Sequence, residues 1–386
     1  MSVRCLFIVQ GEGRGHLTQA MSLRRMLTEA GHRVEGVIVG NSQRRAVPSF
    51  FKDAFSAPVT FVSSPSFVPD GDDRSVRLGA TLGHELLRSP SFVESLRRID
   101  AAVAEHDPDV IVNFFEPLAG LYAVSYQPSI PIVAVAHQYM FHHPTYRFPR
   151  GWVLQRWGAQ TFASVTAWGA SRRLGLSLYP APDRPDDGLV VLPPLLRADL
   201  FEQPTDRSEP FFLVYILNSG YADEVIAWHD RNPDVRLHCF WDRPGADHVE
   251  HYDDTLTFHQ LDDDKFLSLM ARCRGFVSTA GFESIAEAMY LGKPVQVVPV
   301  EGHFEQLCNA FDTVRAQAGI RSTRFEIDHL QDFLSHHRPD AERFRRWVRR
   351  SRSRFVHEIE AAAERRGANV PSSVPEPELP VFETAR

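Results

Sequence analysis

The chain has 386 residues, about twice the usual size of a single domain of roughly 100–200 residues, so two domains are expected. With 43% hydrophobic, 24% charged and 11% aromatic residues, the composition is that of a folded globular protein and excludes a disordered chain. The 42 basic and 49 acidic side chains give a net charge of −7, which argues against a nucleic-acid-binding protein.

The sequence indicates neither a membrane span nor a cysteine-based site. The longest apolar run, 130–136, is far shorter than the roughly 20 residues that a membrane helix needs. The apolar run near the N-terminus is too short for a signal peptide, so we expect a cytoplasmic protein. The four cysteines lie far apart and form no C-x-x-C pair, which favours buried reduced thiols over disulfides or a zinc site.

Buried strands and helices alternate through the first half of the chain. A glycine-rich turn at 11–16 is followed by a helical pattern over Leu17–Ala30. The predicted strands are 5–10, 34–40, 108–115 and 131–137. This alternation is typical of a parallel sheet covered by helices on both faces.

Proline and charge interrupt the pattern between Tyr179 and Pro210, and a second alternating series follows. Its predicted strands are 211–217, 235–240, 256–261, 275–279 and 294–300, and its predicted helices are Tyr221–Asp230, Asp264–Cys273 and Phe282–Leu291. We therefore predict an α/β fold of two Rossmann-like doubly wound domains that face each other across a cleft. The predicted parts are an N-terminal domain (1–190), a linker (191–209), a C-terminal domain (210–338), a basic helix (339–366) and a disordered tail (367–386).

The predicted helix 339–366 is strongly basic, because ten arginines face five acids between Arg338 and Arg366. One interpretation is a surface helix that packs the two domains together. The other is peripheral contact with an anionic membrane, at its inner face in a cytoplasmic protein.

The glycine-rich turn of the first domain carries a candidate base. Gly11, Gly13 and Gly15 lie between a strand and a helix, where the backbone can approach a ligand closely. A dinucleotide fingerprint would need another glycine where His16 stands, and the second strand ends without an acid for a ribose, so a dehydrogenase is disfavoured. An imidazole at this strand end projects toward the crevice where such sheets bind ligands; the alternative for His16 is a helix cap.

In the second domain, polar residues gather where a strand meets a helix. Ser278, Thr279 and Gly281 lie at the start of the predicted helix, where backbone N–H groups and the helix dipole converge. The sequence therefore predicts a diphosphate site that needs no metal ion. Glu287, further along the helix, is spaced to reach ribose hydroxyls, and Glu305 and Gln306 begin the next helix and offer hydrogen bonds to sugar hydroxyls.

These residues together resemble the nucleotide-sugar signature of inverting GT-B-fold glycosyltransferases, the group of the UDP-glycosyltransferases and the peptidoglycan N-acetylglucosaminyltransferase. The positions at the family's spacing are Thr279, Gly281, Ser284, Glu287, Gly292, Pro294, Pro299, Glu305, Gln306 and Asn309, and the segment 13–17 is similar to the family's glycine-histidine loop. The motifs cover about 60 residues and the two-domain architecture about 350.

The resemblance implies a role for each matched residue. Thr279 and Ser284 would contact the phosphates, Glu287 the ribose, and Glu305 with Gln306 the transferred sugar, while His16 would deprotonate the acceptor. The acid that orients the base in plant relatives would fall near 112–117, where either Glu116 or Asn113 is available, and we favour Glu116.

The sequence also departs from the family pattern. Thr279 stands where plant relatives carry histidine, and Glu283 where they carry asparagine, so Glu283 would repel a phosphate. Retaining GT-B enzymes usually place a second glutamate eight positions before the ribose-binding one, and this position is Thr279 here, which favours inversion.

The segments 262–264 and 137–168 have competing interpretations. The aspartates at 262–264 could bind a metal but fit better as a helix cap, while Leu261 before them and the loop of Asn218, Ser219 and Gly220 would face the donor. The aromatic and histidine side chains of 137–168 form either an apolar acceptor cleft or core. Three histidines in this stretch lack an acidic or cysteine partner for a metal.

We therefore predict a metal-independent inverting glycosyltransferase without a cofactor. It would move a sugar from a nucleotide-diphosphate donor, with uridine implied by the resemblance, to a hydroxyl acceptor that is lipid-linked or a small apolar molecule. The alternatives are a nucleotide-sugar 2-epimerase on the same fold and a non-catalytic protein that binds sugar nucleotides.

Overall fold

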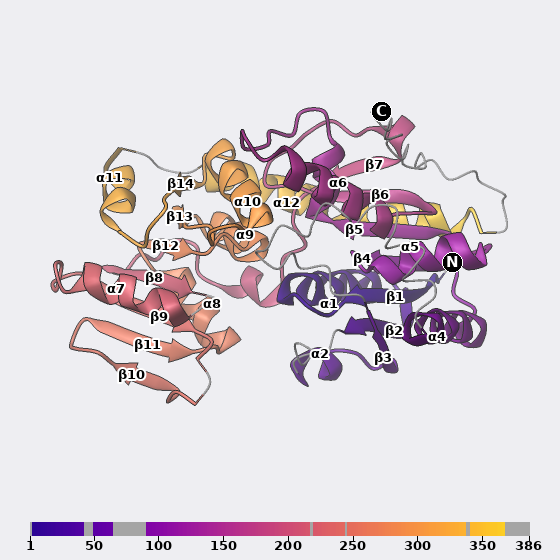
Figure 1. Cartoon of the computed structure of the whole chain (residues 1–386), viewed down its shortest axis with the longest axis horizontal. Helices are drawn as coiled ribbons and strands as arrows, with labels where there is room; N and C mark the ends of the chain where they lie inside the picture. Colours follow the sequence, from indigo (N-terminus) through magenta and orange to yellow (C-terminus); the bar gives the residue numbers. More distant parts are fainter. Residues whose placement is uncertain are drawn as a thin grey trace, which may run out of the picture. The chain divides into compact units, whose positions relative to one another are not determined.

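The computed structural model describes residues 2–41, 49–64, 90–216, 219–243, 245–336 and 340–366. The chain divides into two compact units, each built around one sheet (Figure 1). The first unit comprises Met1–Tyr146, Gly151–Leu195 and Arg350–Arg386, and the second comprises Arg147–Arg150 and Leu196–Arg349. The division after Leu195 falls inside the segment 191–209 that was predicted as the linker. The predicted tail 367–386 lies outside the described residues.

Among the described residues of the first unit, seven parallel strands form a sheet in the order β3-β2-β1-β4-β5-β6-β7. Its elements are β1 (Arg4–Gln10), α1 (Arg14–Glu29), β2 (Arg33–Asn41), α2 (Ser49–Asp53), β3 (Val59–Ser63), α4 (Pro90–His106), β4 (Val110–Phe114), α5 (Pro117–Tyr126), β5 (Ile132–Ala136), η2 (His137–His142), α6 (Val153–Thr166), β6 (Ala170–Leu176), η3 (Pro185–Asp187) and β7 (Leu189–Leu192). The strand order reverses between β1 and β4, which makes this pair the topological switch point of the sheet.

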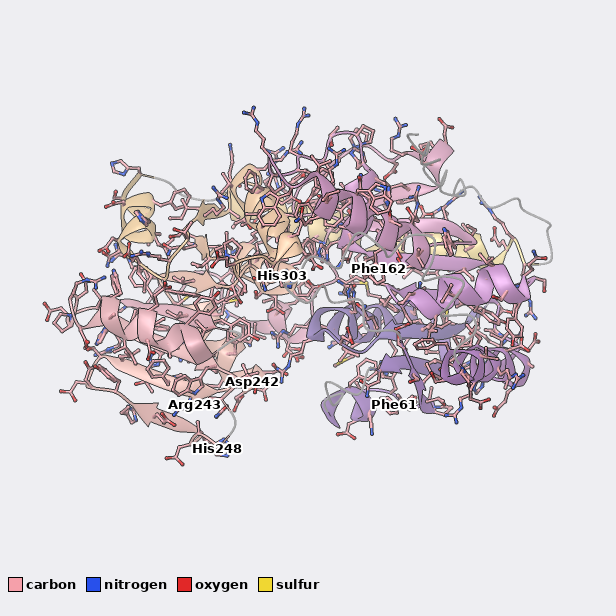
Figure 2. The ribbon with its side chains drawn as sticks, viewed as in Figure 1. Phe61, Phe162, Asp242, Arg243, His248 and His303 are labelled. Carbon is pink, nitrogen blue, oxygen red and sulfur yellow. The ribbon has the colours of Figure 1, made fainter. Side chains whose placement is uncertain are left out.

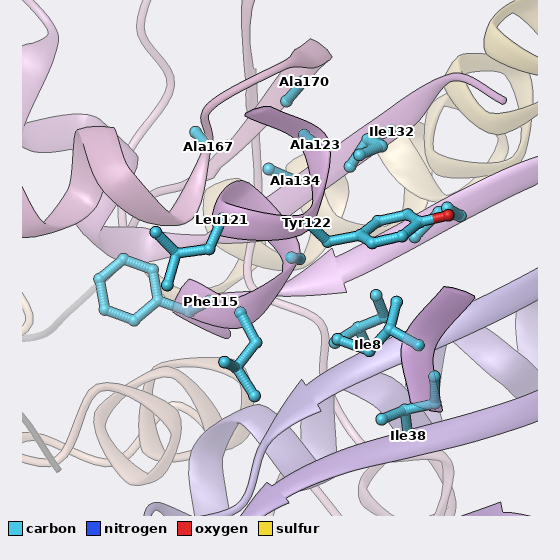
Figure 3. Close-up of a cluster of buried hydrophobic side chains, with 14 of the residues drawn as sticks. Ile8, Ile38, Phe115, Leu121, Tyr122, Ala123, Ile132, Ala134, Ala167 and Ala170 are labelled. Atoms are coloured by element: carbon cyan, nitrogen blue, oxygen red, sulfur yellow. The ribbon is translucent and has the colours of Figure 1, made fainter. Parts of the chain in front are cut away.

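The core of the first unit explains why these segments fold as they do. Strands β4 and β5 are buried along their whole length, as expected for a parallel sheet with helices on both faces. Figure 3 shows one side of this core, where Ile8 of β1 and Ile38 of β2 pack in the same cluster as Tyr122 of α5. Burial of this apolar surface, worth about 25 cal/mol per Å², fixes the strand ends that carry polar residues.

In the part of the second unit that the structure describes, seven strands form a sheet in the order β10-β11-β9-β8-β12-β13-β14. The elements are η4 (Ala198–Glu202), β8 (Phe211–Ile216), η5 (Ser219–Tyr221), α7 (Ala222–His229), β9 (Arg236–Trp241), β10 (Val249–His251), β11 (Leu256–Gln260), α8 (Asp263–Arg272), β12 (Gly275–Ser278), α9 (Phe282–Leu291), β13 (Val295–Val297), α10 (Phe304–Arg315), β14 (Gly319–Arg321) and α11 (Asp328–His336). Only the pairing of β10 with β11 is antiparallel among these described strands. The order reverses between β8 and β12, so this pair is the switch point of the second sheet.

Side-chain caps set several helix boundaries in the second unit. Asp262 accepts a hydrogen bond from the Lys265 N–H at 2.9 Å and caps α8, as expected from the sequence. His303 caps α10 by accepting from the Gln306 N–H at 3.3 Å. Gly292 ends α9 with φ +75°, a left-handed conformation that glycine adopts without strain.

Helix α12 (Ala341–Ala363) contributes residues to both units. Within the first unit, many charged side chains of its second half and of the turn after it are paired with side chains of other elements. These ion pairs are Arg352–Glu29, Arg354–Asp183, Glu358–Arg172, Glu360–His32, Arg366–Asp107 and Arg366–Asp109. In its first half, Arg343, Arg346 and Arg350 follow one another at three- and four-residue steps and are exposed. Across the described ranges, no helix has the length and apolar content to cross a membrane.

Candidate functional site

Both switch points place polar residues at the carboxyl ends of their strands, where open α/β sheets bind ligands. In the first unit, β1 leads to Gly13, Gly15 and His16, and β4 leads to Glu116. In the second unit, β12 leads to Thr279 and α9. The structure therefore brings the predicted base and its predicted partner to one edge of the first sheet, and the predicted phosphate-contacting residues to one edge of the second.

His16 lies in the first turn of α1 and is 7% exposed. Its ring stacks on that of Phe115, with the centroids 5.3 Å apart and an angle of 26°. Its Nδ1 is 3.3 Å from Oε1 of Gln19, one turn along the helix. With the Nδ1 proton donated to Gln19, Nε2 is the nitrogen that accepts a proton. Gly13 is the N-cap of α1 and makes no side-chain cap; a Cβ there would lie 4.0 Å from the His16 ring.

Glu116 is fully buried and caps α5. Its Oε1 accepts from the Ser64 hydroxyl at 2.6 Å and from the Leu118 N–H at 3.1 Å, while Oε2 has no hydrogen-bond partner among the described residues. Burial, assisted by the negative charge of Glu12, raises its pKa to about 7, although the bonds from Ser64 and Leu118 oppose this shift. The hydrogen bonds described for this carboxylate do not include one to His16, so its role in orienting the base stays a prediction.

The backbone around Glu116 is tightly constrained. A Cβ at Gly40 would lie 1.9 Å from Oε2 of Glu116, so only glycine allows the carboxyl group to lie against β2. Asn113, the other candidate for orienting His16, accepts from the Glu116 N–H at 2.9 Å and donates to the carbonyl groups of Glu116 and Thr166. Asn113 therefore holds the turn after β4.

The aromatic residues of 137–168 contribute both to the core and to the surroundings of His16. Tyr139 and Phe141 are buried in the core, and Tyr146 packs on Phe141. Phe115, which stacks on His16, makes edge contacts with Tyr139 at 5.8 Å and with Phe162 at 5.2 Å; Phe162 is labelled on α6 in Figure 2. The half-buried Phe162 thus extends an apolar wall from the candidate base.

In the second unit, the start of α9 has the features of an anion site. Its N-cap is Gly281, which provides no side-chain cap for the first-turn N–H groups. Ser278 is fully buried, and its hydroxyl has no hydrogen-bond partner in the described parts of the chain. Thr279 is buried beside it, and Ala280 takes φ +60°, a strained conformation for a residue with a side chain. Asn309 of α10 donates to the Ala280 carbonyl at 3.0 Å and holds this turn in place.

The candidate ribose-binding residue is already engaged by an arginine. Glu287 of α9 is 3% exposed, and its two carboxylate oxygens accept from Arg197, Oε1 from Nε at 2.6 Å and Oε2 from Nη2 at 2.9 Å. Ser284, one turn nearer the N-terminus of α9, donates to the Gly281 carbonyl at 3.1 Å.

The residues predicted to contact the transferred sugar begin α10. Glu305 is half-buried in the first turn, and Gln306 is 7% exposed. Oε1 of Gln306 accepts from the Val300 N–H at 2.8 Å, so the side chain braces the loop that precedes the helix. His303, labelled in Figure 2, caps the same helix.

The remaining predicted donor contacts that the structure describes lie at the carboxyl ends of β11 and β8, the two strands that flank β9. Leu261 directly follows β11, and Ser219 and Gly220 belong to η5 after β8. Asn218 lies outside the described residues. Asp242 and Arg243, labelled in Figure 2, follow β9.

The candidate metal ligands do not gather into a site. Within the described residues, no group of three or more histidine, cysteine, aspartate or glutamate side chains is placed to hold a metal ion. His143 bonds to the Pro182 carbonyl, and burial, with the charge of Arg173, lowers the pKa of His142 to about 4. All four cysteines are buried and unpaired with one another, as predicted.

Sequence reasoning missed Gln19 and Arg197, and it recognised Asn309 only by its spacing. Gln19 stands three residues after His16, and this helical step was a usable signal. Arg197 is 90 residues from Glu287 in the sequence, and no periodicity connects them.

Comparison with known proteins identifies the family. The model of glycosyl transferase family 1 matches residues 3–337, whereas no curated protein matches the sequence. The chain is similar in fold to the glycotransferase of kitacinnamycin, with a TM-score of 0.62, 18% identity and coverage of 95% of this chain and 100% of that one. It is also similar to CalG4, the calicheamicin glycosyltransferase, with a TM-score of 0.61, 18% identity and coverage of 96% and 100%.

A UDP-glucosyltransferase from Polygonum tinctorium, capable of glucosylating indoxyl, gives a TM-score of 0.58 at 14% identity and coverage of 97% of this chain and 96% of that chain. These structural likenesses confirm the predicted fold class, two Rossmann-like domains of the GT-B type. With the family model covering most of its length, the chain belongs to glycosyl transferase family 1 and is a GT-B glycosyltransferase.

Proposed function

We propose that the chain is an inverting glycosyltransferase that moves a sugar from a nucleotide-diphosphate sugar to a hydroxyl acceptor. The observation that carries this proposal is the second switch point, where the uncapped N-terminus of α9 follows β12 and its buried Ser278 hydroxyl. Uncapped N–H groups at a helix end, with a dipole worth about half a positive charge, are suited to a diphosphate.

The donor is proposed to extend from this point along α9 and α10. Thr279 and Ser284 would contact the phosphates, Glu287 the ribose, and Glu305 and Gln306 the sugar. Leu261 and the segment 218–220 would lie near the base and the phosphates. The neighbour from Polygonum tinctorium is a UDP-glucosyltransferase, which supports uridine diphosphate as the first nucleotide to test.

The chemical step assigns the base to His16. Nε2 takes the proton of the acceptor hydroxyl while its oxygen bonds to the anomeric carbon, and the bond from that carbon to the diphosphate oxygen breaks. The diphosphate leaves with the electron pair, stabilised by the N-terminus of α9. One displacement of this kind inverts the anomeric configuration. Gln19 holds Nδ1, which keeps Nε2 as the accepting nitrogen.

The acceptor is proposed to be a small apolar molecule with a hydroxyl group. Phe115 and Phe162 supply an apolar wall next to His16. The neighbours named for calicheamicin and for glucosylating indoxyl support this class. A lipid-linked acceptor at the inner face of the membrane is the second candidate, and the exposed arginines of α12 favour it.

A panel of nucleotide sugars and hydroxyl acceptors tests the proposal. We expect release of nucleoside diphosphate only when an acceptor is present, and a product with the opposite anomeric configuration by NMR. Transfer with retained configuration would contradict the inverting mechanism. Donor incubated alone should stay unchanged, whereas a 2-epimerase would convert it. The family match gives the epimerase alternative no support. EDTA should leave turnover unchanged.

Replacing His16 by alanine should lower kcat about 100- to 10,000-fold, the usual cost of losing a general base. The dissociation constant of the donor should change little, because His16 belongs to the other unit. Thr18→Ala, which removes only a hydroxyl bonded to the Arg14 carbonyl of the same helix, is the matched control. Turnover of the His16 variant close to that of the wild type would remove His16 from the mechanism.

A further inference from the structure

The ion pair between Arg197 and Glu287 is bidentate, a geometry that packing alone does not require. Two donors on one edge of the guanidinium bond to both carboxylate oxygens, at 2.6 and 2.9 Å. The Glu287 side chain is only 4% exposed and that of Arg197 is 22% exposed. Such a fork fixes the plane of the carboxylate as well as its charge.

Arg197 is itself held firmly in place. It lies directly before η4, whose Leu200 is fully buried. Phe201 of η4 packs edge-on against Tyr290 at 5.1 Å, one helical turn beyond Glu287. The segment therefore follows α9 through two contacts a turn apart. Burial on its own lowers the pKa of Arg197, but the charge of Glu287, with Asp263 and Asp199, outweighs it and raises the pKa, so the guanidinium stays charged.

The pair leaves the carboxylate able to bind a ligand. Each carboxylate oxygen has two acceptor positions, and the arginine occupies one on each. Among the described residues, no donor other than Arg197 bonds to Glu287. The two remaining positions, one on each oxygen, point outward on opposite sides of the carboxylate, so a ribose hydroxyl can donate to one of them. Since a buried ion pair often adds little net stability compared with apolar residues, orientation and charge are the better explanation for this one.

We propose that Arg197 is a positioning residue for the donor site: it fixes the plane of the Glu287 carboxylate so that a remaining acceptor position receives the hydrogen bond of a ribose hydroxyl. This proposal rests on the donor site proposed above. Arg197 has a second effect, because it neutralises a carboxylate on the helix that would receive a diphosphate. Without it, Glu287 would be a buried negative charge free to rotate and to repel the ligand.

Calorimetry with two ligands tests the proposal. The probes are UDP and its 2′,3′-dideoxy counterpart, or the best-binding ribonucleoside diphosphate of the panel and its dideoxy form. We expect the wild type to bind UDP about 10- to 100-fold more tightly than the dideoxy form, the usual value of hydrogen bonds to a charged group. In Arg197→Ala this ratio should fall to about threefold or less, because the carboxylate is no longer oriented. Arg197→Lys should keep the charge but lose most of the discrimination, since it cannot form the fork.

The double variant separates positioning from a general structural effect. If Arg197 acts through Glu287, adding Arg197→Ala to Glu287→Ala should not weaken UDP binding further. The matched control is Arg272→Ala. It breaks the ion pair with Glu209 at the C-terminal end of α8 and should leave the ratio of the two affinities unchanged. Melting temperatures of all variants identify any that fail to fold.

The outcomes distinguish the two proposals. If Glu287→Ala binds both ligands as the wild type does, the ribose contact itself is wrong. If Glu287→Ala loses the discrimination but Arg197→Ala and Arg197→Lys retain it, the donor site stands and the positioning role of Arg197 is refuted. Failure of every nucleotide to bind would refute both proposals.

Discussion

Two residues in an unusual backbone conformation mark the two switch points. Phe115 after β4 and Ala280 after β12 both have φ +60°, although each carries a side chain. A left-handed residue of this kind costs on the order of 1–3 kcal/mol and persists only where its surroundings impose it. Phe115 stacks on His16, and Ala280 precedes the uncapped helix α9. The strained residues therefore lie next to the groups to which we assign base and diphosphate binding.

The sequence could predict the residues of the candidate site that follow a motif. His16 and Glu287 stand at recognisable spacings from glycines and strand ends. The partners of these residues could not be predicted in the same way, because Arg197 reaches Glu287 only through the packing of η4 on α9. For Glu116, the sequence indicated a carboxylate near His16, but it did not indicate the cap, the Ser64 bond or the burial that sets its ionisation.

Glu116 makes stability depend on pH. Its pKa is raised in the folded chain from 4.5 to about 7, mainly by burial, so the folded state holds a proton that the unfolded state releases. The stabilisation is complete below about pH 4.5 and is lost as the pH rises through 7. The free energy of unfolding of Glu116→Gln, relative to that of the wild type, should therefore rise by about 2–3 kcal/mol from pH 5 to pH 8. Urea unfolding at both pH values measures this, with the exposed Glu94→Gln as control. An equal difference at the two pH values would contradict the assigned ionisation.

At the scale of elements, regular patterns were predictable and irregular ones were not. The predicted helix Phe282–Leu291 is observed with those bounds, and α8 and α7 differ from prediction by one residue at each end. Strand β6 was missed because Arg172 and Arg173 interrupt its apolar run; Arg173 is nevertheless buried and donates to the Asp187 carbonyl. Strand β7 has four residues within a proline-rich stretch that indicated a linker.

The turn between β12 and α9 should depend on a residue in another helix. Asn309→Ala removes the bond to the Ala280 carbonyl and leaves a buried acceptor unsatisfied, at a cost of about 1–3 kcal/mol of stability. The turn should also lose its fixed conformation, so the dissociation constant of UDP should rise about tenfold or more if two or more phosphate contacts weaken together. Asn232→Ala is the matched control, because Asn232 bonds in the same way to the Trp228 carbonyl at the end of α7. Unfolding curves and calorimetry on both variants measure the two effects. If the two variants changed UDP affinity equally, the turn would have no special role.

At the scale of the whole molecule, the arrangement into two units was predictable from length and from the repeated alternation of strand and helix. The assignment of short segments to one unit or the other was not predictable. Arg147–Arg150 belong to the second unit although their neighbours on both sides belong to the first, and α12 contributes to both. Such assignments depend on contacts between residues far apart in the sequence, which a pattern of apolar residues does not encode.

The exposed arginines of α12 provide a test of membrane contact. We expect the full chain to co-sediment with vesicles containing anionic lipid at low salt, because each arginine near such a surface is worth about 1 kcal/mol. Substituting Arg343, Arg346 and Arg350 by glutamate should abolish this binding, as should high salt. Substituting Arg352 and Arg354, which are paired with Glu29 and Asp183, is the control and should have less effect. Absence of the wild-type chain from the vesicle pellet at low salt would restrict the acceptor to dissolved molecules.

The binding of a diphosphate at the N-terminus of α9 is tested most directly by the UDP affinity of Gly281→Asp. Gly281 has φ −69° and ψ 131°, which any residue can adopt, and a Cβ there would meet only Ser284 Oγ at 3.4 Å. Aspartate is a favoured N-cap, so the variant should be as stable as the wild type or more stable by a few tenths of a kcal/mol. Its carboxylate would occupy the first-turn N–H groups and repel the ligand, so the dissociation constant should rise about 100-fold or more. Gly281→Ala, without a cap or a charge, should bind almost as the wild type does. A stable Gly281→Asp variant with the wild-type affinity for UDP would contradict the account.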